Sequence, residues 1–248
     1  MNLFLKTSIQ KVFNALGYQL RKADNGVSYT DPYQEQKRIL QNTPVNTIFE
    51  VGAADGRDCV LYTTIFPNAK VFAFEPLPDS FLKVEEKAKI NKSIIPFNVA
   101  VSSQKGTANF YKTELEDASS LLQSQVTNST FDVYQKVKGV IEVQTDTIDN
   151  ICKENKISKI DLLKIDAQGA ELEILKGAMN IIKANNINLI YVEVQFIQLY
   201  KNAPSYHEIA NLLTNNNFRL HNFYGLVHNQ KGQLAWGDAL FVLNGIEY

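Results

Sequence analysis

The sequence has little of what builds disulfide scaffolds, zinc sites or nucleic-acid interfaces. Only two of its 248 residues are cysteines, Cys59 and Cys152, and their separation fits neither a CxxC pair nor a zinc-binding spacing. We expect both to be reduced thiols in the interior of a cytoplasmic protein. The formal net charge is -1, so the composition does not favour a basic surface that holds nucleic acid.

Long apolar runs are also missing. No stretch approaches the roughly 20 apolar residues of a membrane-spanning helix, and the apolar N-terminus is interrupted at Lys6, too early for a secretory signal. We therefore predict a cytoplasmic protein with no transmembrane segment. Residues 1–44 read as an N-terminal helical extension, because apolar residues from Leu5 to Leu16 fall at helical spacing. We expect that helix to pack on the domain or to form a homodimer contact. A membrane-surface helix is the third alternative, but Lys6 and Lys11 supply few positive charges for it.

Residues 45–248 alternate short apolar runs with helical patterns, which predicts one α/β domain with a mostly parallel sheet and helices on both faces. Residues 105–144 interrupt this rhythm with two strand-like runs, which predict a β insertion beside the sheet. The predicted strands of the sheet are 47–51, 70–74, 94–101, 160–165, 188–194, 218–223 and 238–243. The predicted helices are 58–66, 79–90 (starting at Asp79 or Ser80), one that buries Leu172, Leu175, Met179 and Ile182, and 206–214.

The first predicted strand ends in a short loop that contains two glycines and two acids. In open α/β sheets ligands bind at the carboxyl ends of the strands, and Gly52 and Gly56 let the backbone approach a ligand closely. Glu50 and Asp55 would repel a pyrophosphate, which binds bare amides at a helix N-terminus. The loop therefore favours a cationic ligand without phosphate, such as S-adenosylmethionine, over NAD. A purely structural turn is the alternative.

The second predicted strand ends at Glu75, about 20 residues after the glycines. A carboxylate there can accept hydrogen bonds from both ribose hydroxyls, and losing one such bond costs about tenfold in affinity. Glu75→Ala is therefore expected to weaken donor binding with little loss of folding. A capping or surface acid is the alternative, and the ribose alone does not separate NAD from S-adenosylmethionine.

The chain resembles the FkbM family of methyltransferases in several ordered blocks that span about residues 45–243. The blocks are Glu50–Gly56, Ala73–Pro78, Asn98–Val101, Ser119–Leu121 and Leu163–Leu172. The resemblance implies a Rossmann-like class I methyltransferase fold with a seven-stranded sheet and S-adenosylmethionine as the cofactor. It also implies methylation of a hydroxyl oxygen on a small-molecule or sugar acceptor.

Two departures from the family pattern affect the chemistry. Glu50 stands where the family usually has Asp, and this keeps the charge, while Ala54 replaces an Asn. Gln168 stands where the family usually has Glu, and an amide cannot act as a base, although it can hold a substrate by hydrogen bonds.

The remaining cofactor-binding candidates follow from their positions beside these blocks. We expect Asn98 and Ala100, at the end of the third strand, to lie beside the adenine. Ala53 and Pro76 complete the predicted cofactor-binding set.

The candidate catalytic residues are two acids at or near strand ends. Asp166 ends the fourth core strand, where donor and acceptor are expected to meet, and alternation places Lys164 on its face as an expected ion-pair partner. Glu193 lies inside a nearly apolar strand, which is costly unless the acid is paired or functional. A general base accelerates methylation of an alcohol about 10²–10⁴-fold, and Asp166 or Glu193 is the candidate.

Three rival interpretations remain open from the sequence. Asp166 and Glu193 could instead hold a divalent cation, but we predict no metal site because no tight Asp/His cluster is present. The chain could be an NAD-dependent dehydrogenase, which the acidic glycine loop disfavours. It could also be a nucleotide-binding protein that has lost catalysis, which Gln168 makes conceivable.

Overall fold

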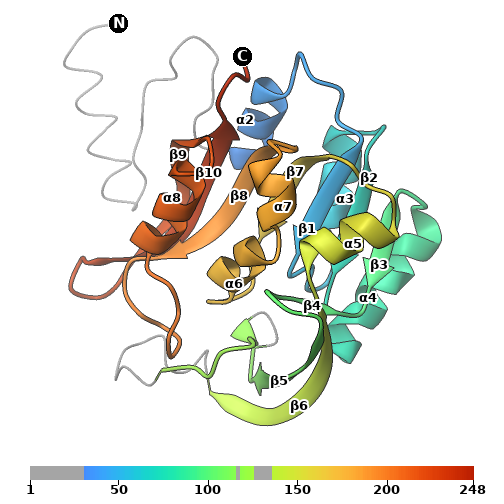
Figure 1. The fold of residues 1–248 in the computed structure, drawn as a ribbon. Helices are drawn as coiled ribbons and strands as arrows, with labels where there is room; N and C mark the ends of the chain where they lie inside the picture. Colours follow the sequence, from blue (N-terminus) through green and yellow to red (C-terminus); the bar gives the residue numbers. More distant parts are fainter. Residues whose placement is uncertain (1–30, 116–117, 126–135) are drawn as a thin grey trace, which may run out of the picture. The chain divides into compact units, whose positions relative to one another are not determined.

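A seven-stranded sheet with the strand order β3-β2-β1-β7-β8-β10-β9 forms the centre of the domain (Figure 1). The computed structural model describes residues 31–115, 118–125 and 136–248. Strand β10 is antiparallel to both of its neighbours and the other pairs are parallel, which confirms the predicted mostly parallel sheet. The strands are β1 (Thr47–Val51), β2 (Lys70–Phe74), β3 (Ile94–Phe97), β7 (Ile160–Ile165), β8 (Ile187–Gln195), β9 (Phe218–His228) and β10 (Leu234–Leu243).

Helices cover both faces of this sheet, as predicted (Figure 1). Alternation along β1 shows the two cores: Phe49 and Val51 face one, and Ile48 faces the other. The core of Ile48 lies under α2 (Pro32–Ile39), α3 (Arg57–Ile65) and α4 (Pro78–Ile90). The core of Phe49 lies under α5 (Ile148–Glu154), α6 (Glu171–Lys176), α7 (Met179–Lys183) and α8 (Tyr206–Thr214).

The predicted β insertion is confirmed as a separate three-stranded sheet in the order β4-β6-β5. Its strands are β4 (Ala100–Val101), β5 (Gly106–Thr113) and β6 (Val137–Asp146). The prediction of one strand over 94–101 was wrong, because the chain leaves the main sheet after β3. The Asn98 side chain donates hydrogen bonds to the carbonyls of Glu75 (2.8 Å) and Pro76 (3.1 Å), and the next residues pair with β6.

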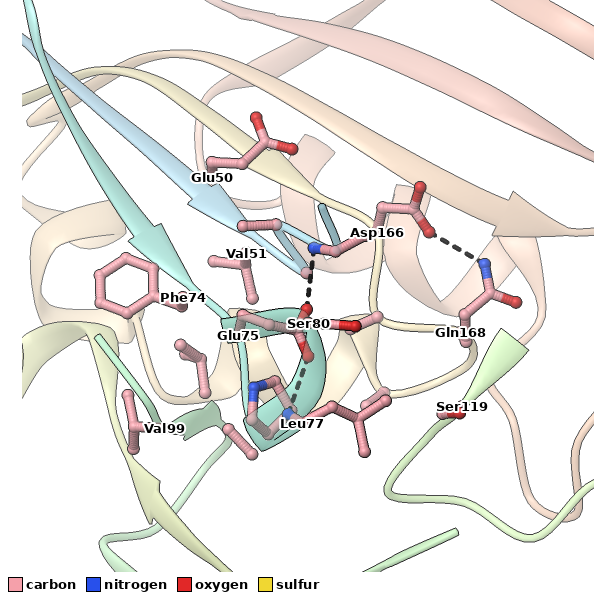
Figure 2. Close-up of a pocket in the computed structure, with 18 of the residues that line it drawn as sticks. Glu50, Val51, Phe74, Glu75, Leu77, Ser80, Val99, Ser119, Asp166 and Gln168 are labelled. Carbon is pink, nitrogen blue, oxygen red and sulfur yellow. Dashed lines mark hydrogen bonds between the residues drawn. The ribbon is translucent and has the colours of Figure 1, made fainter. Parts of the chain in front are cut away.

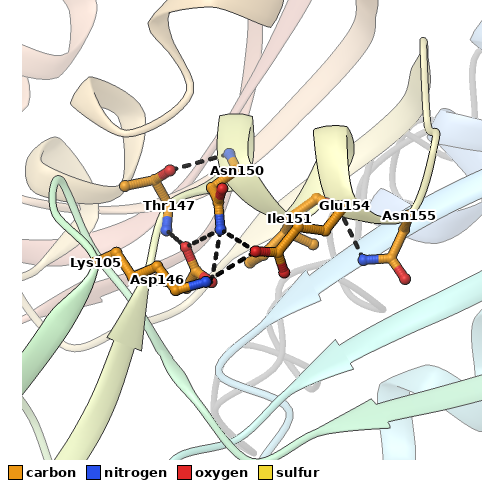
Figure 3. A network of polar contacts seen from close by, with 7 residues as sticks. All are labelled: Lys105, Asp146, Thr147, Asn150, Ile151, Glu154 and Asn155. Atoms are coloured by element: carbon orange, nitrogen blue, oxygen red, sulfur yellow. Dashed lines mark hydrogen bonds and ion pairs between the residues drawn. The ribbon is translucent and has the colours of Figure 1, made fainter.

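A polar network fixes the base of the insertion where β6 continues into α5 (Figure 3). The carboxylate of Asp146 accepts hydrogen bonds from the Thr147 amide (2.7 Å) and the Asn150 side chain (2.9 Å). Lys105, just before β5, bridges Asp146 (3.2 Å) and Glu154 (2.9 Å). Exposed ion pairs contribute little individually, but this set joins the start of β5 and the end of β6 to α5.

The single helix predicted after residue 169 is two short helices, α6 and α7, because Gly177 interrupts it. A Cβ at Gly177 would lie 2.1 Å from the carbonyl oxygen of Ser102, and the Gly177 carbonyl accepts a hydrogen bond from the Asp149 amide (3.0 Å). Helix α4 begins at Pro78, one residue before the predicted start, and Pro suits the first turn because its missing N–H would be unpaired there.

The N-terminal helix predicted between Leu5 and Leu16, and with it the homodimer contact, lies outside the described residues. Helix α2 and the sheet belong to one compact unit, and this unit runs from Pro32 to Tyr248. Within the described ranges, no helix is both long and apolar enough to cross a membrane.

Candidate active site

A cavity of about 290 Å³ opens where β1, β2 and β7 end (Figure 2). Phe74 and Val99 lie on the side of it opposite to Gln168 and Ser119 (Figure 2). Three of the predicted site residues, Gly56, Asn98 and Glu193, do not line the cavity. The predicted residues that line it are Glu50, Gly52, Ala53, Asp55, Glu75, Pro76, Ala100 and Asp166.

The glycine loop brings β1 against the end of β7. Gly52 has a φ of 83°, a left-handed value that favours glycine, and its amide donates to the carbonyl of Phe74 (3.0 Å). A Cβ at Gly52 would lie 1.8 Å from the backbone oxygen of Asp166. Gly56, with a φ of 75°, is the N-cap of α3, so it shapes the loop without lining the cavity.

Glu75 is buried and holds two backbone segments together (Figure 2). One carboxylate oxygen accepts a hydrogen bond from the Ala54 amide (2.8 Å), and the other accepts one from the Leu77 amide (2.8 Å). Each hydrogen bond to a charged group contributes about 1.5–3 kcal/mol. Removal of this carboxylate is therefore expected to cost folding free energy as well, contrary to the expectation from sequence.

A buried ion pair lies beneath the loop. The Lys164 ammonium donates to Glu50 (2.6 Å) and lies 2.9 Å from Asp58. Lys164 therefore pairs with these two acids, whereas the sequence had predicted a pair with Asp166. Burial raises the pKa of Glu50 to about 7, while the Lys164 charge opposes this shift. The second carboxylate oxygen of Glu50 is buried and accepts no hydrogen bond in the described part of the chain. The cavity wall therefore contains a carboxylate oxygen that can accept a hydrogen bond from a bound ligand.

Asp166 and Glu193 come together through Gln168. The Gln168 side-chain nitrogen donates to Asp166 (2.9 Å) and to Glu193 (3.2 Å), and its oxygen accepts from the Tyr200 hydroxyl (2.7 Å). The bond from Tyr200 defines which end of the amide faces the acids. Gln168 also adopts a φ of 54°, which is uncommon for a residue with a side chain. The sequence departure at Gln168 is therefore a link between two carboxyl groups, a role that sequence reasoning missed.

Two further acids, also missed from sequence, surround this link. Glu171 is buried, and one of its oxygens accepts from the amides of Ala167 (3.1 Å) and Gly169 (3.0 Å). Burial raises the pKa of Glu171 to about 7. Asp238 on β10 is opposite Glu193 on β8, and this pairing was visible only once the strand register was known.

The pKa shifts in this cluster and the cavity lining distinguish the two candidate bases, Asp166 and Glu193. Burial raises the pKa of Glu193 well above its usual range, and the charges of Asp166, Glu171 and Asp238 add to the shift. Burial and Asp166 also raise the pKa of Asp238 to about 6, although its hydrogen bond from the Tyr191 hydroxyl (2.8 Å) opposes this. The protonated form of Glu193 is therefore more favourable than that of an exposed carboxyl group. Asp166, unlike Glu193, lines the cavity.

The β insertion supplies the outer wall of the cavity. Phe110, Ser119 and Leu121 line it, and the hydroxyl of Ser120 donates to the backbone carbonyl of Gln168 (2.7 Å). The insertion is thus joined to the segment that carries Asp166 and Gln168.

Comparisons with known proteins agree with this geometry. Residues 50–220 match the Methyltransferase FkbM domain. The 2-O-methyltransferase NoeI of Sinorhizobium fredii is 26% identical over 180 residues, which cover 70% of this chain and 73% of the relative. The hexuronic acid methyltransferase AglP of Haloferax volcanii is 27% identical over 150 residues, which cover 60% of this chain and 56% of the relative. Among solved structures, precorrin-6y C5,15-methyltransferase from Geobacter metallireducens GS-15 has a TM-score of 0.45 at 8% identity and covers 91% of this chain and 94% of its own.

The strand order, with one antiparallel strand inserted beside the edge, and the cavity at the strand ends are those of a Rossmann-like class I methyltransferase fold. The match to a methyltransferase domain assigns S-adenosylmethionine as the cofactor. The matched domain covers more than half of the sequence, so the chain belongs to the FkbM family of methyltransferases. This membership decides against the dehydrogenase interpretation.

Proposed function

We propose that this enzyme methylates a hydroxyl oxygen of a sugar or a similar small acceptor, with Asp166 as the general base. The observation that carries the proposal is the position of Asp166, which lines the cavity at the end of β7 and is bound to Gln168. The names of two relatives, a 2-O-methyltransferase and a hexuronic acid methyltransferase, support an oxygen acceptor on a sugar.

The residues of the cavity fit the methyl donor. When bound, S-adenosylmethionine supplies a methyl group on a cationic sulfur. The buried Glu50 oxygen that accepts no hydrogen bond within the described residues would accept one from the amino group of the donor. Glu75, which lines the cavity, would accept from the ribose. The apolar side chains of Leu77 and Val99 would pack against the adenine. Gly52, Ala53, Asp55, Pro76 and Ala100 complete the proposed lining.

Asp166 would accept the proton of the acceptor hydroxyl, which makes the oxygen a better nucleophile. Gln168 would hold the Asp166 carboxylate in place through its hydrogen bond, and the same amide nitrogen donates to Glu193, whose pKa is raised by burial. The cavity walls hold the acceptor close to the reacting centre, and this alignment accounts for much of the rate enhancement in a displacement reaction.

Paired variants test these roles. We expect Asp166→Asn to lower kcat by about 10²–10⁴-fold with unchanged donor affinity in calorimetry. Glu193→Gln should cost much less, because Glu193 does not line the cavity and the new amide oxygen can still accept the hydrogen bond from Gln168. Turnover is measured with radiolabelled methyl donor and an extract of the host cell. A wild-type rate in Asp166→Asn removes Asp166 as the base, and a loss confined to Glu193→Gln assigns that role to Glu193.

The family membership also decides against a binding protein without catalysis, which would bind the donor without any labelled product in the same experiment. We also propose that the enzyme works in the cytoplasm. The buried, unpaired thiols of Cys59 and Cys152 support a reducing compartment.

A further inference from the structure

The cavity has a strong excess of acidic side chains. Five carboxyl groups line it, from Glu50, Asp55, Asp58, Glu75 and Asp166, against two cationic side chains, from Arg57 and Lys164. Both cations are already engaged. Lys164 lies between Glu50 and Asp58 (2.6 and 2.9 Å), and Arg57 pairs with Asp55 (3.0 Å) while its side chain is 76% exposed.

The excess is greatest where the acceptor would bind. Three further acids lie around Asp166. Gln168 donates to both Asp166 (2.9 Å) and Glu193 (3.2 Å), Asp238 is opposite Glu193 in the strand register, and Glu171 accepts from the amide of Ala167, the residue after Asp166. Residues 118–125, which include Ser119 and Leu121 of the cavity wall, contain no Lys, Arg or His. Lys201, on the loop that follows β8, donates to the Gln123 side chain (2.9 Å) and does not line the cavity.

We propose that the acceptor has no negative charge beside the hydroxyl that is methylated, so that it is a neutral or amino sugar and not a hexuronate. This inference rests on the proposed role of Asp166. At an effective dielectric constant of about 20, two like charges about 6 Å apart weaken binding about a hundredfold. Even if solvent halves that energy, about tenfold discrimination against an anionic acceptor remains. The acceptor class then differs from the one in the name of the hexuronic acid methyltransferase relative.

The first test identifies the charge of the natural product. The full-length enzyme is incubated with radiolabelled methyl donor and host-cell extract, and the labelled material is hydrolysed and separated by charge. A labelled neutral or amino compound is the expected result. A labelled carboxylic acid overturns the inference but leaves the methyltransferase proposal intact, whereas the absence of any labelled product overturns both.

The second test uses matched acceptors at pH 8, where Asp238, with a pKa of about 6, is ionised. Methyl glycosides, the corresponding uronates and the neutral uronamides differ only at one carbon. We expect kcat/KM for the neutral members to exceed that for the uronates about tenfold or more. Equal or higher values for the uronates contradict the inference.

A charge-removing variant locates the source of the discrimination. Asp238→Asn should lower the ratio of neutral to uronate turnover severalfold, because it removes one of the acids behind Asp166. Glu86→Gln removes the same charge from an exposed position on α4 and should leave the ratio unchanged. If both variants change the ratio equally, the discrimination comes from net charge and not from the cavity.

Discussion

Replacing Gln168 by Glu tests the link between the two carboxyl groups and restores the residue that the family usually has at this position. In the wild-type chain the Gln168 nitrogen lies 2.9 Å from an oxygen of Asp166 and 3.2 Å from one of Glu193. Gln168→Glu puts a carboxylate oxygen where this amide donates, and the variant can restore a hydrogen bond only by taking up a proton. We therefore expect the cluster to retain a proton to higher pH than in the wild type.

The magnitude follows from these distances. Two like charges about 4 Å apart interact by about 4 kcal/mol at an effective dielectric constant of about 20, which equals about three pH units. Sharing of a proton and small side-chain movements relieve much of this energy. A shift of about one pH unit or more should survive, since one unit corresponds to only 1.36 kcal/mol. Because the base must lose its proton before it acts, the acidic limb of the kcat profile should move to higher pH.

The assay is kcat against pH between about 5 and 9, with saturating donor and acceptor. Gln168→Glu should approach wild-type activity at the alkaline end. Tyr200→Phe is the matched control, because it removes the 2.7 Å bond that orients the Gln168 amide without adding charge. It should lower kcat without moving the acidic limb. Superimposable profiles for the wild type and Gln168→Glu would refute the proposed coupling of these acids.

Three further substitutions test the rest of the site. Glu75→Gln should lower the free energy of unfolding by about 1.5–3 kcal/mol, because one of its two amide bonds is lost, and weaken donor binding about tenfold or more; unchanged calorimetric affinity removes Glu75 from the donor site. Glu171 has a raised pKa of about 7, so the folded state loses stability as pH rises from about 4.5 to 7, by up to about 3 kcal/mol. Glu171→Gln should flatten that slope in urea titrations at several pH values, and an unchanged slope would contradict the assignment. Gly52→Ala should lower the free energy of unfolding by about 2–4 kcal/mol, since the added Cβ would overlap the Asp166 carbonyl. An unchanged free energy of unfolding in denaturant titrations would show that the ends of β1 and β7 can move apart without cost.

The positions of most strands along the chain, and the residues that follow them, were predictable from the sequence because both depend on local patterns. Apolar runs that end in small or acidic residues identify strand ends, and parallel strands bring those ends to one edge. The positions of Gly52 and Asp166 at the cavity therefore agree with expectation. The break after β3 was not predictable, because it depends on hydrogen bonds from Asn98 to a loop 22–23 residues earlier.

The partners of charged residues were less predictable, since they depend on register between strands. Alternation placed Lys164 and Asp166 on one face, but β1 pairs with β7 so that Glu50 lies directly beside Lys164. Asp238 joins the acid cluster because β10 returns antiparallel to β8 and sets it opposite Glu193. Neither relation has a signal in a single segment of sequence.

The acidic side chains of the cavity have two roles: they stabilise the cationic methyl donor, and one of them is the proposed base. A cationic donor is stabilised by nearby carboxylates, and a base must remain close to it without neutralising it by a direct ion pair. Gln168 meets both needs, because its amide donates to Asp166 and Glu193 without adding charge. Burial raises the pKa of Glu193, which lowers the cost of placing this acid beside Asp166. Gly52 lies against the backbone of Asp166, and this contact fixes the distance between the glycine loop and the proposed base whether or not an acceptor is bound.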